Sequence, residues 1–174
     1  EREKIELGPA LILQRISEVK SGTAKISDLK KSNSPEDKLI LEIFGEYEEK
    51  LQKNNAFDFD DLIQKVVHIF KKEPAILEKY QKRYLHILID EYQDLNGKQH
   101  ELIRILTKDL ASRRGSLSAV GDDNQMIYSW RGSDINIFLD FEKDWPMSQT
   151  VLLEENYRST ACIIRAAQTV IQNN

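Results

Sequence analysis

A short apolar run that ends on two carboxylates constrains the fold more than any other part of the sequence. Residues 85–89 (LHILI) have the length and the leucine and isoleucine content expected of a strand buried on both faces. Asp90 and Glu91 follow directly. A strand that leaves a parallel core on two acids places them at its carboxyl end, where open α/β sheets bind ligands.

These two acids suggest a nucleotide site with Mg²⁺. Asp90 is a candidate ligand for the metal, because Mg²⁺ takes oxygen ligands and keeps several waters. Glu91 is a candidate for orienting or deprotonating an attacking water. The alternative is that both acids only end the strand and solvate the loop.

A second run repeats the pattern of strand and acid. Residues 117–120 (LSAV) are predicted to form a strand that ends at Gly121 and Asp122. Between the two runs, Asn96 and Gln99 have the spacing of a capping box, which predicts a helix there. The order strand, helix, strand, with both strands ending on acid, predicts a parallel α/β fold with one ligand-binding edge. Residues 150–153 are predicted to form a third strand.

Most of the remaining chain has helical patterns. Residues 23–33 are polar and are predicted to form a loop with one helical turn at most. The predicted helices share a capping residue or a proline at their start. They begin at Pro9, Ser34–Pro35, Asp58, Pro74, Asn96, Ser133 and either Ser159 or Thr160.

Composition limits the class of protein. The chain has 174 residues, 40% of them hydrophobic and 31% charged, as in ordinary globular proteins. Its formal net charge of -4 argues against a general nucleic-acid coat but leaves room for a local basic groove. A single cysteine, Cys162, allows no internal disulfide, and no apolar run is long enough for a membrane span. We therefore expect an intracellular, cytoplasmic protein without a membrane partner.

Residues 121–134 (GDDNQMIYSWRGSD) fit no core periodicity and concentrate candidate binding groups. Gln125 can hydrogen-bond a phosphate oxygen or a water. Tyr128 and Trp130 can stack on unpaired bases, and Arg131 can pair with a phosphate or a carboxylate. The alternative is that the two aromatic side chains belong to the core or to an interface.

Residues 152–160 (LLEENYRST) contain a further pair of candidates. Tyr157 can lie against an adenine ring, and Arg158 can reach a γ-phosphate as an arginine finger. The local alternative is that Arg158 pairs with Glu154 or Glu155.

Together, LIDEYQD, VGDDNQMIYSWRGSD and LLEENYRST resemble motifs II, III and IV of the UvrD/Rep-type superfamily I DNA helicases. The preceding FDFDDLI is also similar to that family, so the resemblance extends from about Ala56 to the end of the chain. Asn124 and Met126 stand where the family commonly has Asp and Ser. The resemblance implies a DNA repair helicase that uses ATP and Mg²⁺.

The resemblance also implies a role for each site residue. Asp90 would hold Mg²⁺, and Glu91 would activate the hydrolytic water beside it. Gln125 would sense the γ-phosphate, Tyr157 would pack on adenine, and Arg158 would contact the γ-phosphate.

On the DNA side, the family implies that Tyr128 and Trp130 stack on single-stranded DNA. Arg131 would couple that loop to the nucleotide site. The substrates would be single-stranded DNA and junctions between single strand and duplex, with translocation in the 3′ to 5′ direction.

The implied fold is part of a RecA-like parallel sheet of the P-loop NTPase type. Residues 1–55 would be a helical 1B-like subdomain, residues 56–148 the second half of domain 1A, and residues 149–174 the start of domain 2A. The sequence contains no G-x-x-x-x-G-K-S/T phosphate loop. We therefore expect a fragment that does not hydrolyse ATP by itself. Two alternatives are a non-catalytic module that binds single-stranded DNA or docks a partner, and a helicase-nuclease subunit.

Overall fold

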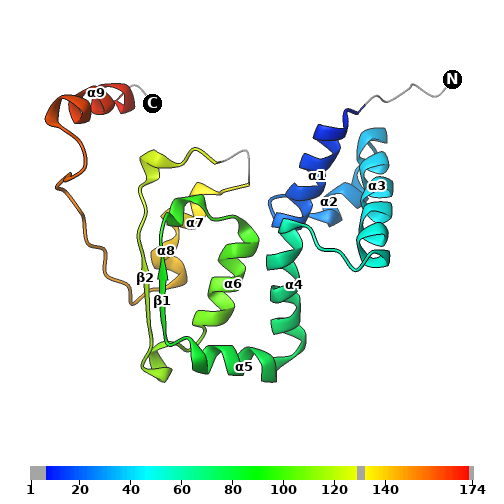
Figure 1. Cartoon of the computed structure of the whole chain (residues 1–174), viewed down its shortest axis with the longest axis horizontal. Coiled ribbons are helices and arrows are strands. Elements are labelled where there is room, and N and C mark those ends of the chain that lie inside the picture. Colours follow the sequence, from blue (N-terminus) through cyan, green and yellow to red (C-terminus); the bar gives the residue numbers. More distant parts are fainter. Residues whose placement is uncertain (1–6, 129–131, 173–174) are drawn as a thin grey trace. The chain divides into compact units, whose positions relative to one another are not determined.

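The computed structural model describes residues 7–128 and 132–172. The chain divides into two compact units, Glu1–Asp140 and Phe141–Asn174, and each is described by itself. Figure 1 shows the elements of both units coloured along the sequence.

The first unit contains a two-stranded parallel sheet of β1 (His86–Ile89) and β2 (Ser116–Ala119). His86 pairs with Ser116 and Ile89 with Ala119, so both strands end at the same edge of the sheet. Helix α6 (Gly97–Thr107) and the short helix η2 (Ala111–Arg113) connect them (Figure 1). The predicted α/β arrangement of strand, helix and parallel strand is therefore confirmed for this part of the chain.

One expectation for β1 is wrong. The strand was expected to be buried on both faces, but Leu88 is 80% exposed and exposed residues alternate with partly buried ones along β1. Alternation is the pattern of a strand with one covered face. In the described residues β1 has β2 as its neighbour in the sheet, and nothing there covers the Leu88 face.

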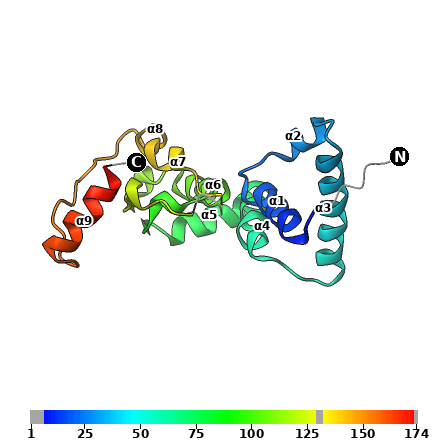
Figure 2. The ribbon, with the colours of Figure 1, turned by 90° about the horizontal axis from the view of Figure 1, so that it is seen from above.

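Helices precede the sheet. They are α1 (Pro9–Ser21), α2 (Ile26–Lys31), α3 (Pro35–Lys53), α4 (Phe59–Lys72) and α5 (Pro74–Arg83). Helix α4 packs against α1, α5 and α6, and α3 packs against α1 and α2. Figure 2 shows α1, α2 and α3, in blue to cyan, gathered beside α4. Helix α2 exceeds the single turn expected for this polar segment, because Leu29 is buried and holds it against the bundle.

Capping residues explain where two of these helices begin. The Asp58 side chain accepts a hydrogen bond from the Asp61 N–H, and the Asp61 side chain accepts one from the Asp58 N–H. Asn96 and Gln99 form the same reciprocal capping box at α6. Both predicted caps are confirmed, because two backbone donors at each helix start find side-chain acceptors.

A short helix η1 (Tyr92–Asp94) follows β1 and precedes α6, and η3 (Asp123–Gln125) and α7 (Ile135–Leu139) follow β2. Tyr92 in η1 is buried and packs against Phe138 of α7, with ring centroids 6.4 Å apart. This contact lies next to the ends of β1 and β2, so it fixes the segments that follow both strands.

The second unit contains α8 (Phe141–Asp144) and α9 (Ala161–Ile171). The third strand predicted at residues 150–153 is wrong: these residues have no regular structure, and Val151, Leu152 and Leu153 are exposed. A strand requires a hydrogen-bonding neighbour, and the described residues of this unit contain none. Ile163 and Val170 of α9 are exposed as well.

Among residues 7–128 and 132–172, the buried apolar side chains lie in the first unit. They come from the helical bundle, from η1 and from the turn after α6, and they are Ile16, Leu29, Ile40, Val67, Phe70, Tyr92 and Leu110. None of the described helices combines the length and the apolar character needed to cross a membrane.

Candidate active site

Asp90 and Glu91 lie at the carboxyl end of β1, where the sequence predicts them. Both are exposed. Glu91 has the left-handed backbone conformation, with φ 51° and ψ 47°, and its N–H donates to Asp90 Oδ1 at 3.0 Å. A residue other than glycine rarely adopts this conformation, and such outliers concentrate at functional sites. The chain thus turns sharply between the two candidate carboxylates.

Gln125 lies beyond the end of the neighbouring strand. Asp122 caps η3 by accepting a hydrogen bond from the Asn124 N–H at 3.0 Å. Its second carboxylate oxygen accepts from Gln125 Nε2 at 2.8 Å. Because β1 and β2 are parallel and in register, Gln125 follows the same sheet edge as Asp90 and Glu91.

Gln93 joins the two strand ends, and the sequence reasoning missed it. This side chain is 1% exposed. Its Nε2 donates to Glu91 Oε2 at 2.7 Å, and its Oε1 accepts from the Asp122 N–H at 3.1 Å. The signal in the sequence is a lone amide in LIDEYQD, but its burial depends on the second strand, which lies far away in the sequence.

Contacts with two other parts of the chain hold residues 132–134. Thr23 Oγ1, in the turn after α1, donates to the Gly132 carbonyl at 3.4 Å. The Asp134 N–H donates to the Leu95 carbonyl at 3.3 Å, and Asn96 and Ser133 form an isolated bridge. Gly132 has φ 84°, and a Cβ there would lie 2.3 Å from Thr23 Oγ1, so this approach requires glycine.

The DNA-binding candidates precede Gly132 in the sequence. Tyr128 is 38% exposed, so part of its ring faces solvent. Trp130 and Arg131 lie outside the described residues. Their predicted roles therefore stand on the sequence.

Tyr157 and Arg158 lie in the second unit, before α9, and both are exposed. The Tyr157 hydroxyl donates to Glu155 Oε2, and this hydrogen bond raises the pKa of Tyr157. The Arg158 and Ser159 N–H groups both donate to Asn156 Oδ1, at 3.0 and 2.9 Å. Asn156 thus shapes the turn that carries both candidates.

Carboxylate side chains provide possible oxygen ligands for a cation at two places. Asp90 and Glu91 are adjacent in the sequence and both are exposed, and carboxylate oxygens suit a hydrated Mg²⁺. Among the described residues, Glu48, Asp58 and Asp61 form the cluster of acids compact enough for a metal. The buried Lys20 ammonium already lies among these three, at 2.7 Å, 2.7 Å and 3.0 Å from their oxygens.

The pKa values of this cluster show that it is an ion network. Burial lowers the pKa of Lys20, but its hydrogen bonds to Asp58, Glu48 and Asp61 outweigh burial and raise the pKa above 10.5. Burial also raises the pKa of Asp58, yet the hydrogen bonds from Lys20, Asp61 and Tyr47 bring it below 3.8. Burial and the bond to Asp58 raise the pKa of Tyr47 to about 12. A lysine ammonium therefore fills the cluster in place of a metal.

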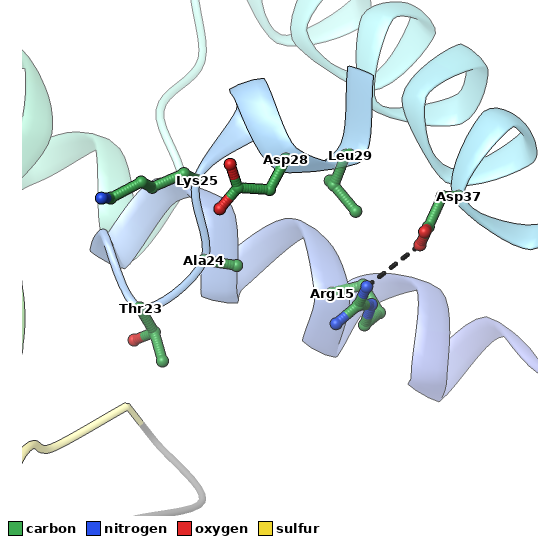
Figure 3. Close-up of a pocket in the computed structure, with 7 residues that line it drawn as sticks. All are labelled: Arg15, Thr23, Ala24, Lys25, Asp28, Leu29 and Asp37. Atoms are coloured by element: carbon green, nitrogen blue, oxygen red, sulfur yellow. Dashed lines mark hydrogen bonds and ion pairs between the residues drawn. The ribbon is translucent and has the colours of Figure 1, made fainter. Parts of the chain in front are cut away.

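A cleft of about 300 Å³ lies elsewhere, in the helical bundle. Figure 3 shows its lining, which comes from α1, the following turn, α2 and the start of α3. Arg15 spans it by an ion pair to Asp37 at 3.1 Å (Figure 3). None of the candidate site residues lines this cleft, so it is separate from the site at the strand ends.

Comparison with known proteins identifies the family. The model of the UvrD/REP helicase N-terminal domain matches residues 2–146. The ATP-dependent DNA helicase PcrA of Bacillus subtilis (strain 168) is 43% identical over 167 residues, which cover 95% of this chain and 22% of that protein. PcrA of Staphylococcus aureus (strain Mu50 / ATCC 700699) is 40% identical over the same shares of the two chains. The present chain thus spans 22% of the length of these relatives. Since the family match includes both strand ends, the helical bundle and the segment between Gln125 and Asp134, the chain belongs to the UvrD/REP helicase family.

Proposed function

We propose that this chain is an internal part of an ATP-dependent DNA helicase. The observation that carries the proposal is the junction at the sheet edge. There, Asp90 and Glu91 follow one strand, Gln125 follows its parallel neighbour, and hydrogen bonds link the two segments. The membership in a helicase family and the name of the PcrA relatives support the same function.

The nucleotide chemistry follows from these groups. Asp90 and Glu91 present the oxygens that Mg²⁺ takes as ligands, and a bound Mg²⁺ neutralises charge on the triphosphate. Glu91 accepts a proton from the attacking water, and Gln125 donates an amide hydrogen bond to the γ-phosphate. Tyr157 packs on adenine, and Arg158 neutralises charge that develops on the γ-phosphate.

DNA binding is assigned to the segment after Gln125. Tyr128 and Trp130 stack on successive unpaired bases, which requires no particular sequence. Arg131 couples this segment to the nucleotide site. The whole protein then moves in the 3′ to 5′ direction along single-stranded DNA and opens duplex at junctions.

We propose domain limits from the same resemblance to the helicase family. Residues 1–55 are a helical 1B-like subdomain, residues 56–148 the second half of a RecA-like domain 1A, and residues 149–174 the entry into domain 2A. The parallel pair β1 and β2 with its α6 connection supports the RecA-like assignment. Because the sequence has no phosphate loop, the isolated chain does not hydrolyse ATP.

The test is DNA-stimulated ATP hydrolysis by the full-length protein and by the isolated chain. We expect turnover in the full-length protein, a loss of about 100-fold or more on Glu91→Gln, and none in the isolated chain. An inactive full-length protein would exclude the helicase function. If the isolated chain hydrolyses ATP and Glu91→Gln abolishes that activity, the prediction that a chain without a phosphate loop is inactive is wrong.

The missing phosphate loop also favours a second candidate function. The chain would then be a non-catalytic module that binds single-stranded DNA or docks a partner. The gene that encodes the chain distinguishes the two, because the helicase requires a phosphate loop upstream and the module does not.

A further inference from the structure

Gln93 is the buried contact between the two strand ends. Its side chain comes from η1, directly after Glu91, and reaches the backbone at Asp122, directly after β2. A Cβ at Gly121 would lie 2.6 Å from Gln93 Oε1, which is too close. Glycine at this position therefore makes space for the Gln93 amide. The contact therefore depends on one residue from each strand end.

The chemistry of the partners fixes the orientation of the amide. Glu91 Oε2 is a carboxylate oxygen and accepts, whereas the Asp122 N–H donates. Gln93 Nε2 must therefore face the Glu91 carboxylate, and Gln93 Oε1 must face the Asp122 N–H. If the amide were flipped, its oxygen would face the carboxylate oxygen and its NH₂ group would face the N–H. Gln93 therefore holds one oxygen of the Glu91 carboxylate and leaves the other oxygen to accept a proton.

The same bonds continue to Gln125. Gln93 holds the Asp122 backbone, and the Asp122 carboxylate accepts from Gln125 Nε2 at 2.8 Å. A continuous chain of hydrogen bonds thus runs from Glu91 through Gln93 and Asp122 to Gln125. Its central amide is almost fully buried, where water competes little for the bonds.

We propose that Gln93 is a positioning residue for ATP hydrolysis, which fixes the Glu91 carboxylate relative to Gln125. The proposal rests on the function proposed above. Gln93 touches neither ATP nor water in this role. It acts on turnover through Glu91 and Gln125, so its loss lowers kcat and leaves nucleotide binding in place.

The first test compares two glutamines in the full-length protein. Gln93→Met keeps the side-chain length and removes both hydrogen bonds. Gln81→Met is the matched control, because Gln81 Nε2 donates to the Ile105 carbonyl away from the strand ends. We expect Gln93→Met to lower DNA-stimulated kcat by about 10-fold or more with the KM for ATP within about threefold, and Gln81→Met to change kcat by less than about twofold.

Gln93→Glu separates the two bonds. It keeps an acceptor for the Asp122 N–H, but it replaces the donor to Glu91 with a second carboxylate. We expect kcat to fall at least as far as in Gln93→Met. A kcat like that of the wild type would overturn the role of the Glu91 contact.

A double-mutant cycle excludes a merely structural role. In a Glu91→Gln background, single-turnover hydrolysis should fall by less than about twofold when Gln93→Met is added, because the group to be positioned is already lost. Equal losses in both backgrounds, a loss of ATP binding, or normal kcat in Gln93→Met would overturn the proposal. An inactive wild-type full-length protein would overturn the proposed function itself, whereas an active protein indifferent to Gln93→Met would overturn only this inference.

Discussion

Lys20 shows how one buried charge can organise three helices. Its side chain is fully buried in α1, and its ammonium pairs with Glu48 of α3 and with Asp58 and Asp61 at the start of α4. Removing the ammonium from such a network leaves Glu48 and Asp58 without their lysine and Asp61 with Lys65 alone, at 3.3 Å. Loss of one partner of a buried ion network costs more than the network itself contributes. The three carboxylates would then repel one another within 4.8 Å.

We therefore expect Lys20→Met to lower the free energy of unfolding by about 3 kcal/mol or more. Lys53→Met is the matched control, because Lys53 forms an exposed ion pair with Glu49 on α3. Exposed pairs of this kind contribute about 0.5 kcal/mol or less. Urea denaturation followed by circular dichroism measures both variants, and equal losses would contradict the ion network as the cause.

The same residues predict how stability depends on pH. The pKa of Lys20 is raised in the folded state, so its contribution is complete below pH 10.5 and is lost as the pH rises beyond that value. Tyr47 adds to this loss as the pH rises from 10.0 to about 12. The pKa of Asp58 is lowered, so its contribution is present above pH 3.8 and is lost as the pH falls below it.

The loss of stability at high pH tests the Lys20 network more specifically than the loss at low pH. The pKa values of Asp37, Glu78 and Glu101 are also lowered, so these three groups contribute to the loss at low pH. The urea concentration at the unfolding midpoint should be lower at about pH 11.5 than at about pH 7 in the wild type, and this decrease should be smaller in Lys20→Met. An unchanged alkaline loss in that variant would assign the effect to other groups.

At the level of the elements, caps decide where helices begin. Asn96 Oδ1 accepts from the Lys98 and Gln99 N–H groups at the start of α6, the helix that connects β1 to β2. We expect Asn96→Ala to cost about 1 kcal/mol of stability. Ser34→Ala is the control at the start of α3, where the serine side chain makes no capping hydrogen bond, and it should cost much less. Thermal unfolding of both variants checks this, and similar losses would refute the assignment.

The success of prediction differs between kinds of element. Helix starts at Pro9, Asp58 and Asn96 were predictable from local sequence. Proline suits the first helical position, and the caps at Asp58 and Asn96 are contacts between residues three apart or fewer. The parallel pairing of β1 and β2 followed from the helix between them. The strand expected at residues 150–153 failed because apolar, β-prone residues do not form a strand without a neighbour.

The candidate site was partly predictable for the same reason. Asp90, Glu91 and Asp122 could be placed at strand ends from the local sequence, and the structure puts them there. The role of Gln93 could not be read in this way, because its two partners lie on different strands and its burial arises only after the sheet forms. A buried polar residue becomes informative only when its partners are known.

At the scale of the whole molecule, residues 1–55 are joined to the rest of the first unit by helix packing and by polar contacts at two places. The Lys20 network joins α1 and α3 to α4, and Thr23 binds the backbone at Gly132, after the proposed DNA-binding residues. The proposed boundary near residue 55 therefore crosses a buried ion network. The domain limits remain a prediction, and these contacts indicate that residues 1–55 support the segment that carries Tyr128.

The last prediction concerns coupling between DNA and nucleotide in the full-length protein. Trp130 lies outside the described residues, and its proposed role is to stack on a base, which contributes about 1–3 kcal/mol. Trp130→Ala should therefore weaken binding of a single-stranded oligonucleotide by about fivefold or more and lower DNA-stimulated ATP turnover, with ATP binding unchanged. Tyr128→Phe is the control, because it keeps the aromatic ring and should retain DNA binding. Fluorescence anisotropy with labelled oligonucleotide and labelled nucleotide measures both affinities. An equal loss of ATP affinity in Trp130→Ala would mean that the tryptophan supports the fold, because a stacking contact with DNA has no reason to act on a nucleotide bound without DNA.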